Sequence, residues 1–294
     1  MNKNIKLNRI KILTTLGPQT LNKQSIEKIN DRNIDFLRIN LSHTSLAQLE
    51  SHIKLIQKYS NISICIDTEG AQVRNCTMDH KIFYKVGSRV KIVNDSKVIG
   101  NDNIISIRPK ESLNQLVVGS IITIDFDGVM LLVNEIHKSF VVATVLNNGY
   151  VVDNRAITFF PFATLPPLTK KDEKAIKIAK DYGISCFALS FTNTAQDVKK
   201  FKGLTGENAF IISKIETKKG VENIGEILEE VDAVLIDRGD LSREVPLENI
   251  PYLQKTIITK ARSVNKDVYV ATNLLESMLH KKNPTRAEVH DVIN

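Results

Sequence analysis

The chain has 294 residues, of which 42% are hydrophobic and 25% are charged, and its formal net charge is +7. These values are typical of a globular protein with a sizeable hydrophobic core. The basic residues are scattered, without a run of five or six, so the excess charge does not support an extended nucleic-acid-binding stripe.

Short β-like runs alternate with amphipathic helical stretches along most of the chain. We expect strands at residues 9–17, 34–43, 62–70, 184–191, 209–216, 233–237 and 266–273. We expect helices at residues 21–33, 45–59, 169–183, from 194 onward, and at 220–231, 252–264 and 285–294. The strand runs are rich in Ile, Val, Ala and Leu instead of alternating with polar residues. This pattern predicts an α/β fold with a parallel sheet that is buried on both faces.

Residues 75–162 interrupt this alternation. They are poor in helix-forming residues, and the runs at 89–93, 121–126, 129–136 and 140–146 resemble antiparallel strands separated by turns. We therefore expect an inserted all-β domain at 75–162 and an α/β domain formed by 1–74 and 163–294. Seven expected strands do not decide between two α/β architectures. A closed barrel needs eight, and an open doubly wound sheet tolerates seven but lacks its GxGxxG turn here.

Three cysteines lie far apart and form no CxxC pair, which argues against a disulfide framework and a structural zinc site. Residues 1–13 lack the apolar core of a signal peptide, and no segment approaches about 18 consecutive apolar residues. We therefore expect a cytoplasmic protein without membrane segments. In that compartment, Arg238-Gly239-Asp240 would not serve as an extracellular adhesion motif.

Polar residues follow nearly every expected strand of the α/β part. In chain order they are Arg38, Asn40, Ser42, His43, Asp67, Thr68, Arg74, Ser190, Lys214, Glu216, Asp237, Arg238, Gly239, Asp240, Thr272 and Asn273. Each alone has an ordinary structural explanation, such as an ion pair, a helix cap or a turn. Together they would face one mouth at the carboxyl ends of the strands, where burying so many polar groups without a ligand would be unfavourable.

The residue types at this mouth indicate the ligands. Glu216 and Asp240 are hard oxygen ligands that suit Mg²⁺ or Mn²⁺. Lys214 and Arg38 suit a phosphate or a developing negative oxygen, and the backbone N–H groups of Gly239 and Asp240 suit a carboxylate. A separate oxygen-rich set could hold a monovalent cation: Asn40, Ser42, Asp67 and Thr68. The predicted ligand is a small molecule with both phosphate and carboxylate groups.

Several stretches together resemble the pyruvate kinase family, in family order and spacing. They are KILTTLGPQT, LRINLSHTS, CIDTEGAQVR, LPPLTKKD, ISKIETKKGVENIGEIL, DRGDLSREVPLENIPYLQK and ATNLLESMLHKKNPTRAEVHDV. The resemblance implies a (β/α)8-type TIM barrel with an all-β cap inserted after the third strand and a C-terminal regulatory domain. The family transfers phosphoryl from phosphoenolpyruvate to ADP in glycolysis, giving pyruvate and ATP.

The resemblance also implies a role for each matched residue. Glu216 and Asp240 would hold Mg²⁺ or Mn²⁺, and K⁺ would lie at the four-residue oxygen set. Arg38 and Lys214 would bind the phosphoryl group, and Lys214 would stabilise the enolate oxygen. The substrate carboxylate would bind at Gly239 and Asp240, with Thr272 near the face that is protonated. The residues on the nucleotide side would be His43, Arg74 and Arg155.

The sequence also departs from the family pattern. The third-strand motif, usually DTKGPEIR, reads DTEGAQVR, so Glu69 reverses a charge and Gln72 removes one. Asp237 replaces a small residue that usually precedes Arg-Gly-Asp. Near the return from the cap, only Arg155 remains of an expected lysine pair. The phosphoenolpyruvate and metal half therefore matches the family better than the ADP half does.

The sequence ends in the helix after the seventh strand, so the expected barrel is truncated there. We expect either a homo-oligomer or completion by a missing C-terminal part. Three functions stay open. They are a pyruvate kinase, a divergent metal-dependent enzyme acting on phosphoenolpyruvate, pyruvate or another 2-oxoacid without ADP, and a non-catalytic ligand-binding remnant. The expected small-molecule partners are phosphoenolpyruvate and ADP. Binding to nucleic acid or to a membrane is not expected.

Overall fold

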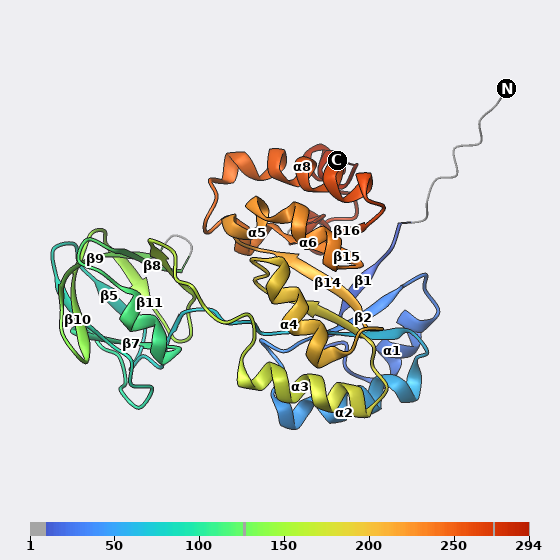
Figure 1. The fold of residues 1–294 in the computed structure, drawn as a ribbon, viewed down its shortest axis with the longest axis horizontal. Coiled ribbons are helices and arrows are strands. Elements are labelled where there is room, and N and C mark those ends of the chain that lie inside the picture. Colours follow the sequence, from blue (N-terminus) through green and yellow to red (C-terminus); the bar gives the residue numbers. More distant parts are fainter. Residues whose placement is uncertain (1–9, 126–127, 273, 294) are drawn as a thin grey trace. The chain divides into compact units, whose positions relative to one another are not determined.

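A computed structural model describes residues 10–125, 128–272 and 274–293 of the chain (Figure 1). The chain divides into two compact units. The first comprises the residues up to Gly70 and from Pro167 onward, and the second is Ala71–Pro166.

The first unit is built on a seven-stranded sheet in which every pairing is parallel. In spatial order the strands are β1 (Leu13–Thr15), β2 (Phe36–Asn40), β3 (Ser63–Asp67), β13 (Cys186–Leu189), β14 (Phe210–Ile215), β15 (Ala233–Asp237) and β16 (Asp267–Ala271). Each strand of this unit lies beside the one before it in the chain. A doubly wound sheet would instead reverse its strand order, so this order indicates a barrel.

The two edge strands of the sheet approach each other. Lys11, just before β1, forms an ion pair with Asp267 at the start of β16. Leu13 of β1 packs against the same hydrophobic cluster that contains Tyr269 of β16. The sheet is therefore curled into a nearly closed barrel, and the predicted truncated TIM-type fold is confirmed.

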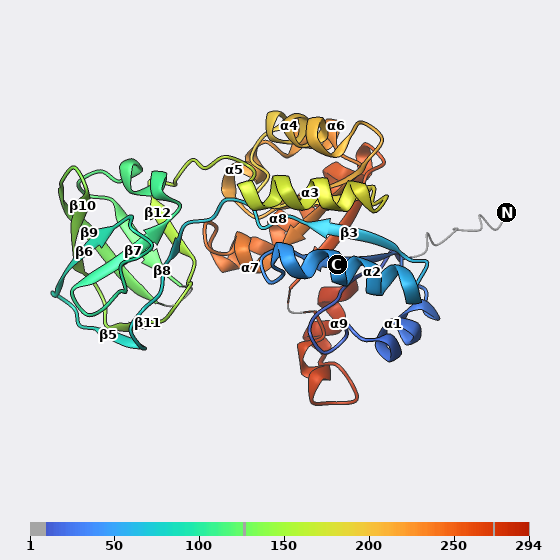
Figure 2. The same ribbon diagram turned by 90° about the horizontal axis from the view of Figure 1, so that it is seen from below.

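The helices of this unit are α1 (Lys23–Asn30), α2 (Leu46–Tyr59), α3 (Lys170–Asp181), α4 (Ala195–Thr205), α5 (Lys218–Glu222), α6 (Ile224–Glu230), α7 (Arg238–Leu241), α8 (Ile250–Ser263) and α9 (Arg286–Ile293), with 3-10 turns η2 (Leu247–Asn249) and η3 (Glu276–Leu279). Helices such as α2, α3, α4 and α6 cover the outer face of the seven-stranded sheet, α7 lies at the end of β15, and α9 projects from the barrel (Figures 1 and 2). The single helix expected at 220–231 was wrong, because the structure has two helices that meet at Asn223. None of the described helices is long and apolar enough to cross a membrane.

Both faces of the sheet are buried, as the apolar strand runs predict. On β13, Phe187 and Leu189 belong to the core between the sheet and the helices. The alternate residues Cys186 and Ala188 belong to a smaller cluster inside the barrel. This alternation follows from the period of two in a β-strand.

The second unit is an all-β domain. Its larger sheet has the order β12 (Ile157–Phe160), β8 (Ile121–Ile124), β9 (Val129–Ile136), β10 (Phe140–Val145), β6 (Arg89–Val93), β7 (Ile104–Arg108) and β4 (Arg74–Asn75). A smaller sheet pairs β5 (Ile82–Tyr84) with β11 (Gly149–Val151), and η1 (Lys110–Gln115) is a 3-10 turn. The four expected strands are present, with mutual pairings that are antiparallel. The pairing of β6 with β7 is parallel, because residues 94–103 carry the chain back to the same end.

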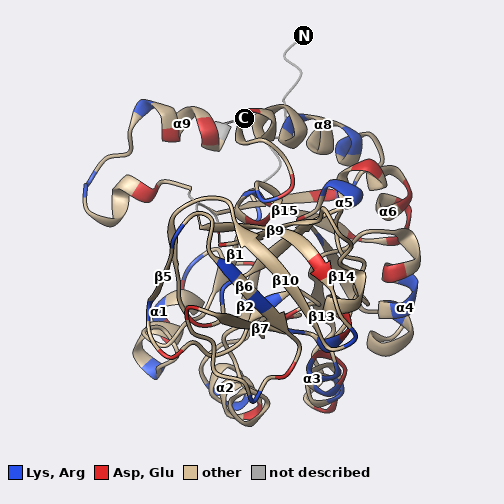
Figure 3. Cartoon of the chain, turned by 90° about the vertical axis from the view of Figure 1, so that its left-hand side faces the viewer, with Lys and Arg blue, Asp and Glu red and all other residues tan. Residues whose placement is uncertain are grey.

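Lys and Arg residues are interspersed with Asp and Glu along the outer helices (Figure 3). Several of the ion pairs there join exposed side chains, such as Lys54 with Glu50 on α2. Such pairs contribute little to stability. The scattered charge expected from the sequence is thus present on the helices, and the tightly held charges lie elsewhere, at the ends of the strands.

One helix start is tied to the loop after β3. Asp172 is fully buried, and its carboxylate accepts hydrogen bonds from the backbone N–H groups of Glu69 (2.7 Å) and Gly70 (3.2 Å). It also accepts bonds from the backbone N–H (2.9 Å) and the hydroxyl (2.8 Å) of Thr169, the N-cap of α3. Replacement of Asp172 would leave these donors without their acceptor.

We therefore expect Asp172→Ala to lower the free energy of unfolding by roughly 3 kcal/mol. Urea denaturation followed by circular dichroism measures the change. The control is Glu173→Ala, because Glu173 is exposed in the same first turn. A loss at Asp172 no larger than the loss at Glu173 would show that this network does not stabilise the fold.

Candidate active site

Most of the expected polar residues lie at the carboxyl ends of neighbouring parallel strands, whereas Arg74 belongs to the second unit and Asn273 lies outside the described residues. Asn40 at the end of β2 is in register with Asp67 at the end of β3. Lys214 lies near the end of β14, beside β15, which ends at Asp237. Lys214 and Glu216 are two residues apart, so the strand periodicity turns both to the inside while Ile215 joins the outer core. The local sequence thus places the charged groups at one end of the barrel.

Asp67 is the centre of this cluster. Its carboxylate is fully buried and accepts hydrogen bonds from Arg38, with the Nε atom at 2.8 Å, and from the hydroxyl of Ser190 at 3.2 Å. The Nζ atom of Lys214 lies 3.5 Å away. Arg38 also donates to the hydroxyl of Thr15 at 2.8 Å, so the guanidinium is held on two sides.

Lys214 is a buried cation with several partners. It is 5% exposed, its Nζ atom lies 2.8 Å from Glu216 Oε1, and it donates to the Ser190 hydroxyl at 3.1 Å. Burial opposes the charged form, but the negative charges of Asp67 and Glu216 outweigh it and raise the pKa of Lys214. The ammonium group therefore stays protonated at the mouth of the barrel.

Three carboxylates meet beside Lys214. Glu216, Asp237 and Asp240 each offer an oxygen, and these oxygens all lie within 4.8 Å of one another. Glu216 is 1% exposed, and its Oε2 atom accepts a hydrogen bond from the backbone N–H of Phe191 at 2.6 Å. Burial raises the pKa of Glu216 to about 7; Lys214 opposes this increase, and Asp240 and Asp237 add to it.

The donor set fits a divalent cation. Glu216 Oε1 is buried and accepts no hydrogen bond, so the 2.8 Å approach of Lys214 Nζ is an ion pair without hydrogen-bond geometry. Glu216, Asp237 and Asp240 together offer three hard oxygen donors, which are the kind of ligand that Mg²⁺ and Mn²⁺ prefer. The sequence-predicted pair, Glu216 and Asp240, is therefore brought together, and Asp237 joins it.

The end of β15 is organised around Thr272. The Thr272 hydroxyl donates to Asp237 Oδ1 at 2.7 Å, and its backbone has a positive φ of 79°. A Cβ atom at Gly239 would lie 3.0 Å from Thr272 Cγ2, so glycine permits this close approach. Gly239 and Asp240 lie in the first turn of α7, and their role as N–H donors to a carboxylate stays a prediction.

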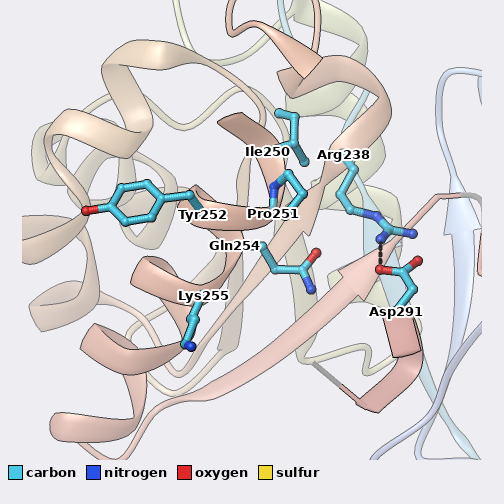
Figure 4. A pocket seen from close by; sticks show the side chains of 7 residues that line it. All are labelled: Arg238, Ile250, Pro251, Tyr252, Gln254, Lys255 and Asp291. Atoms are coloured by element: carbon cyan, nitrogen blue, oxygen red, sulfur yellow. Dashed lines mark hydrogen bonds and ion pairs between the residues drawn. The ribbon is translucent and has the colours of Figure 1, made fainter. Parts of the chain in front are cut away.

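Arg238 points away from this carboxylate group. It forms an ion pair with Asp291 of α9 and donates to the backbone carbonyl of Thr272. Figure 4 shows this pair at the edge of a cavity of about 320 Å³. The cavity is lined by Arg238, Ile250, Pro251, Tyr252, Gln254, Lys255 and Asp291. The cavity thus lies along α8 and includes none of the predicted catalytic residues.

The four oxygen-bearing residues predicted to hold K⁺ follow β2 and β3. Asn40 Oδ1 accepts a hydrogen bond from the backbone N–H of Ser42 at 2.9 Å, and Ser42 is exposed. Thr68 is buried, and its hydroxyl accepts a bond from the backbone N–H of Ser190 at 2.9 Å. The carboxylate of Asp67 is directed to the cationic groups described above, so a role as a K⁺ ligand stays a prediction.

The three predicted nucleotide-side residues are divided between the units. His43 is exposed and follows β2 in the first unit. In the second unit, Arg74 donates to the backbone carbonyl of Asn154 at 2.8 Å, and Arg155 forms a 3.2 Å ion pair with Asp125. Their role in nucleotide binding stays a prediction.

Two polar residues, Ser190 and Asp237, belong to the candidate site although no role there was assigned to them from the sequence. Ser190 links Asp67 to Lys214, and Asp237 joins the carboxylate group. In the sequence, both residues lie at the end of an expected strand, and this position could have indicated a role in the site. A single serine or aspartate at a strand end is weak evidence for such a role. Glu69, the charge-reversed residue of the third-strand motif, lies 3.1 Å from Lys171 Nζ in an ion pair.

The fold and the site define a class of protein: an α/β barrel whose mouth combines a buried lysine and a partly buried arginine with three carboxylates. The family described as "Pyruvate kinase, barrel domain" matches residues 7–294, and the chain belongs to this family.

Individual relatives agree with this assignment. Plastidial pyruvate kinase 3 of Arabidopsis thaliana is 31% identical over 97% of this chain and 51% of its own length. The pyruvate kinase of Thermotoga maritima is 32% identical over 97% of this chain and 63% of its own length. A crystal structure of a pyruvate kinase from Cryptosporidium parvum is similar with a TM-score of 0.84 and 30% identity, covering 96% of this chain and 61% of that one. The chain thus spans about half to three fifths of the length of these relatives.

Proposed function

We propose that this chain performs the phosphoryl transfer of a pyruvate kinase, from phosphoenolpyruvate to ADP, in the cytoplasm. The observation that carries the proposal is the pairing of two cations, Arg38 and Lys214, around buried Asp67, directly beside the Glu216 group. Phosphoryl transfer depends mainly on positioning and on neutralising negative charge. Fixed cations beside a metal-binding group supply both.

The chain's own residues would act on phosphoenolpyruvate as follows. Arg38 and Lys214 would bind the transferring phosphoryl group, and Asp67 holds both side chains in position. The ammonium of Lys214 would then stabilise the negative oxygen of the enolate that forms when the phosphoryl group leaves. The backbone N–H groups of Gly239 and Asp240 would bind the substrate carboxylate. Thr272 would lie near the carbon that is protonated to give pyruvate.

Ions and nucleotide would complete the site. Glu216 and Asp240 would hold Mg²⁺ or Mn²⁺, which supplies charge neutralisation for the phosphoryl oxygens. The K⁺ site would be formed by Asn40, Ser42, Asp67 and Thr68. The ADP contacts would come from His43, Arg74 and Arg155. The buried, hydrogen-bond-deficient oxygen of Glu216 supports the divalent-ion assignment.

The test is ³¹P NMR of phosphoenolpyruvate with the protein, Mg²⁺ and K⁺, with and without ADP. We expect the phosphoenolpyruvate signal to be replaced by ATP signals only when ADP is present. Loss of the signal without ADP would replace the proposal with an ADP-independent enzyme. An unchanged spectrum in both samples would contradict both catalytic functions and favour a ligand-binding protein.

A further inference from the structure

The metal-binding group contains one carboxylate more than the predicted pair. Asp237 is the last residue of β15. Its carboxylate lies within 4.8 Å of the oxygens offered by Glu216 and Asp240. A small side chain without an oxygen atom, such as that of alanine, could offer no ligand at this position. Asp237 therefore adds a third carboxylate to the site itself.

A hydrogen bond holds the carboxylate of Asp237 in a fixed orientation beside the other two carboxylates. Thr272 donates to its Oδ1 atom at 2.7 Å, and the backbone of β15 is paired in register with β16, with Asp237 opposite Ala271. Hydrogen bonds of this kind orient a ligating carboxylate and keep it from rotating away. A carboxylate has two oxygens with about four lone-pair sites, so the Thr272 contact leaves capacity for a cation.

A second observation at the site points to a cation. Glu216 is 1% exposed, and its Oε1 atom accepts no hydrogen bond. The nearest cation, Lys214, is shared, because it also donates to Ser190 and lies 3.5 Å from Asp67. A buried carboxylate that shares its counter-charge in this way is stabilised by a further positive ion.

We propose that Asp237 is a third carboxylate ligand of the divalent cation, held in position by Thr272. The inference rests on the proposed function, because it concerns the same metal site. Three carboxylates should bind the cation before any organic substrate is present. The extra negative charge should also weaken the attraction of the site for the anionic substrate, compared with a site that has two carboxylates.

The test is calorimetric titration of the substrate-free protein with Mn²⁺. We expect Asp237→Asn, which keeps an acceptor for Thr272, to raise the Mn²⁺ dissociation constant by about tenfold or more. Asp237→Ala should do the same. In Mn²⁺-saturated protein, Asp237→Asn should lower the dissociation constant for phosphoenolpyruvate, so that the two ligands respond in opposite directions.

Two variants separate the possible failures. Asp291→Asn is the matched control, because it removes a carboxylate that is paired with Arg238 outside the group, and its Mn²⁺ affinity should change less than about threefold. Glu216→Ala should weaken Mn²⁺ binding whether or not Asp237 is a ligand. Weak binding in Glu216→Ala with unchanged binding in Asp237→Asn would overturn the inference alone. Unchanged binding in both would overturn the proposed metal site as well.

Discussion

Lys214→Met is expected to reduce the turnover of phosphoenolpyruvate by about 10³-fold, because it removes the cation proposed to stabilise the enolate oxygen. The methionine keeps most of the side-chain length but cannot donate a hydrogen bond or carry a charge. The steady-state rate of pyruvate formation measures the effect. Turnover within about threefold of wild type would place the catalytic cation elsewhere.

The structure requires a stability control for this variant. Lys214 is buried against Glu216 and Asp67, so its removal leaves buried carboxylates without their nearest shared cation. Circular dichroism must therefore show that the variant is folded at the assay temperature. Lys214→Arg provides a second test, since it keeps the charge and should retain more activity than the methionine variant. Lys218→Met, at an exposed position on α5, should leave turnover unchanged.

Asp67→Asn is expected to lower the free energy of unfolding by roughly 3–5 kcal/mol, because it breaks a buried ion-pair network from one side. Asp67 is fully buried and is the common partner of Arg38 and Lys214. An asparagine would leave the buried ammonium of Lys214 and the partly buried guanidinium of Arg38 without the carboxylate between them. Urea denaturation measures the loss, and a raised KM for phosphoenolpyruvate should accompany it because both phosphoryl-binding groups lose their anchor.

A matched variant shows whether the loss of stability comes from burial of the ion pair or from the loss of any ion pair. Asp267→Asn removes another strand carboxylate that is paired with a cation, Lys11, but the side chains of this pair are about 40–50% exposed. Its effect on stability should be below about 1 kcal/mol. Equal losses in the two variants would mean that the environment of Asp67 is not what makes its ion pairs important.

The residues of the candidate site could largely be found in the sequence because their positions follow a local rule. A polar residue that ends a buried apolar strand is visible from its neighbours in the chain, as in the sequence around Lys214 and Glu216. The parallel arrangement then requires that such residues meet at one end of the sheet. The expected helix ranges that begin at 45, 169 and 194 agree with the structure, in which Ser45, Thr169 and Thr194 are the N-caps.

Other features depended on contacts between distant segments. Helical periodicity across residues 220–231 does not show that the chain divides at Asn223. The choice between a barrel and an open sheet is set by which strands become neighbours, and the approach of Lys11 to Asp267 joins residues 256 positions apart. The direction of Arg238, towards Asp291 and not into the metal group, is likewise decided by the packing of α9.

The sequence by itself determined the α/β class, the family and the polar residues at the strand ends, because each is encoded in short stretches of residue type and spacing. Only the tertiary structure decided how these residues pair. Asp67 could not be identified as the shared partner of Arg38 and Lys214, nor Asp237 as a neighbour of Glu216, until separate strands were placed side by side. The physical reason is that Coulombic and hydrogen-bond interactions depend on distances in space, which the order of residues along the chain does not specify.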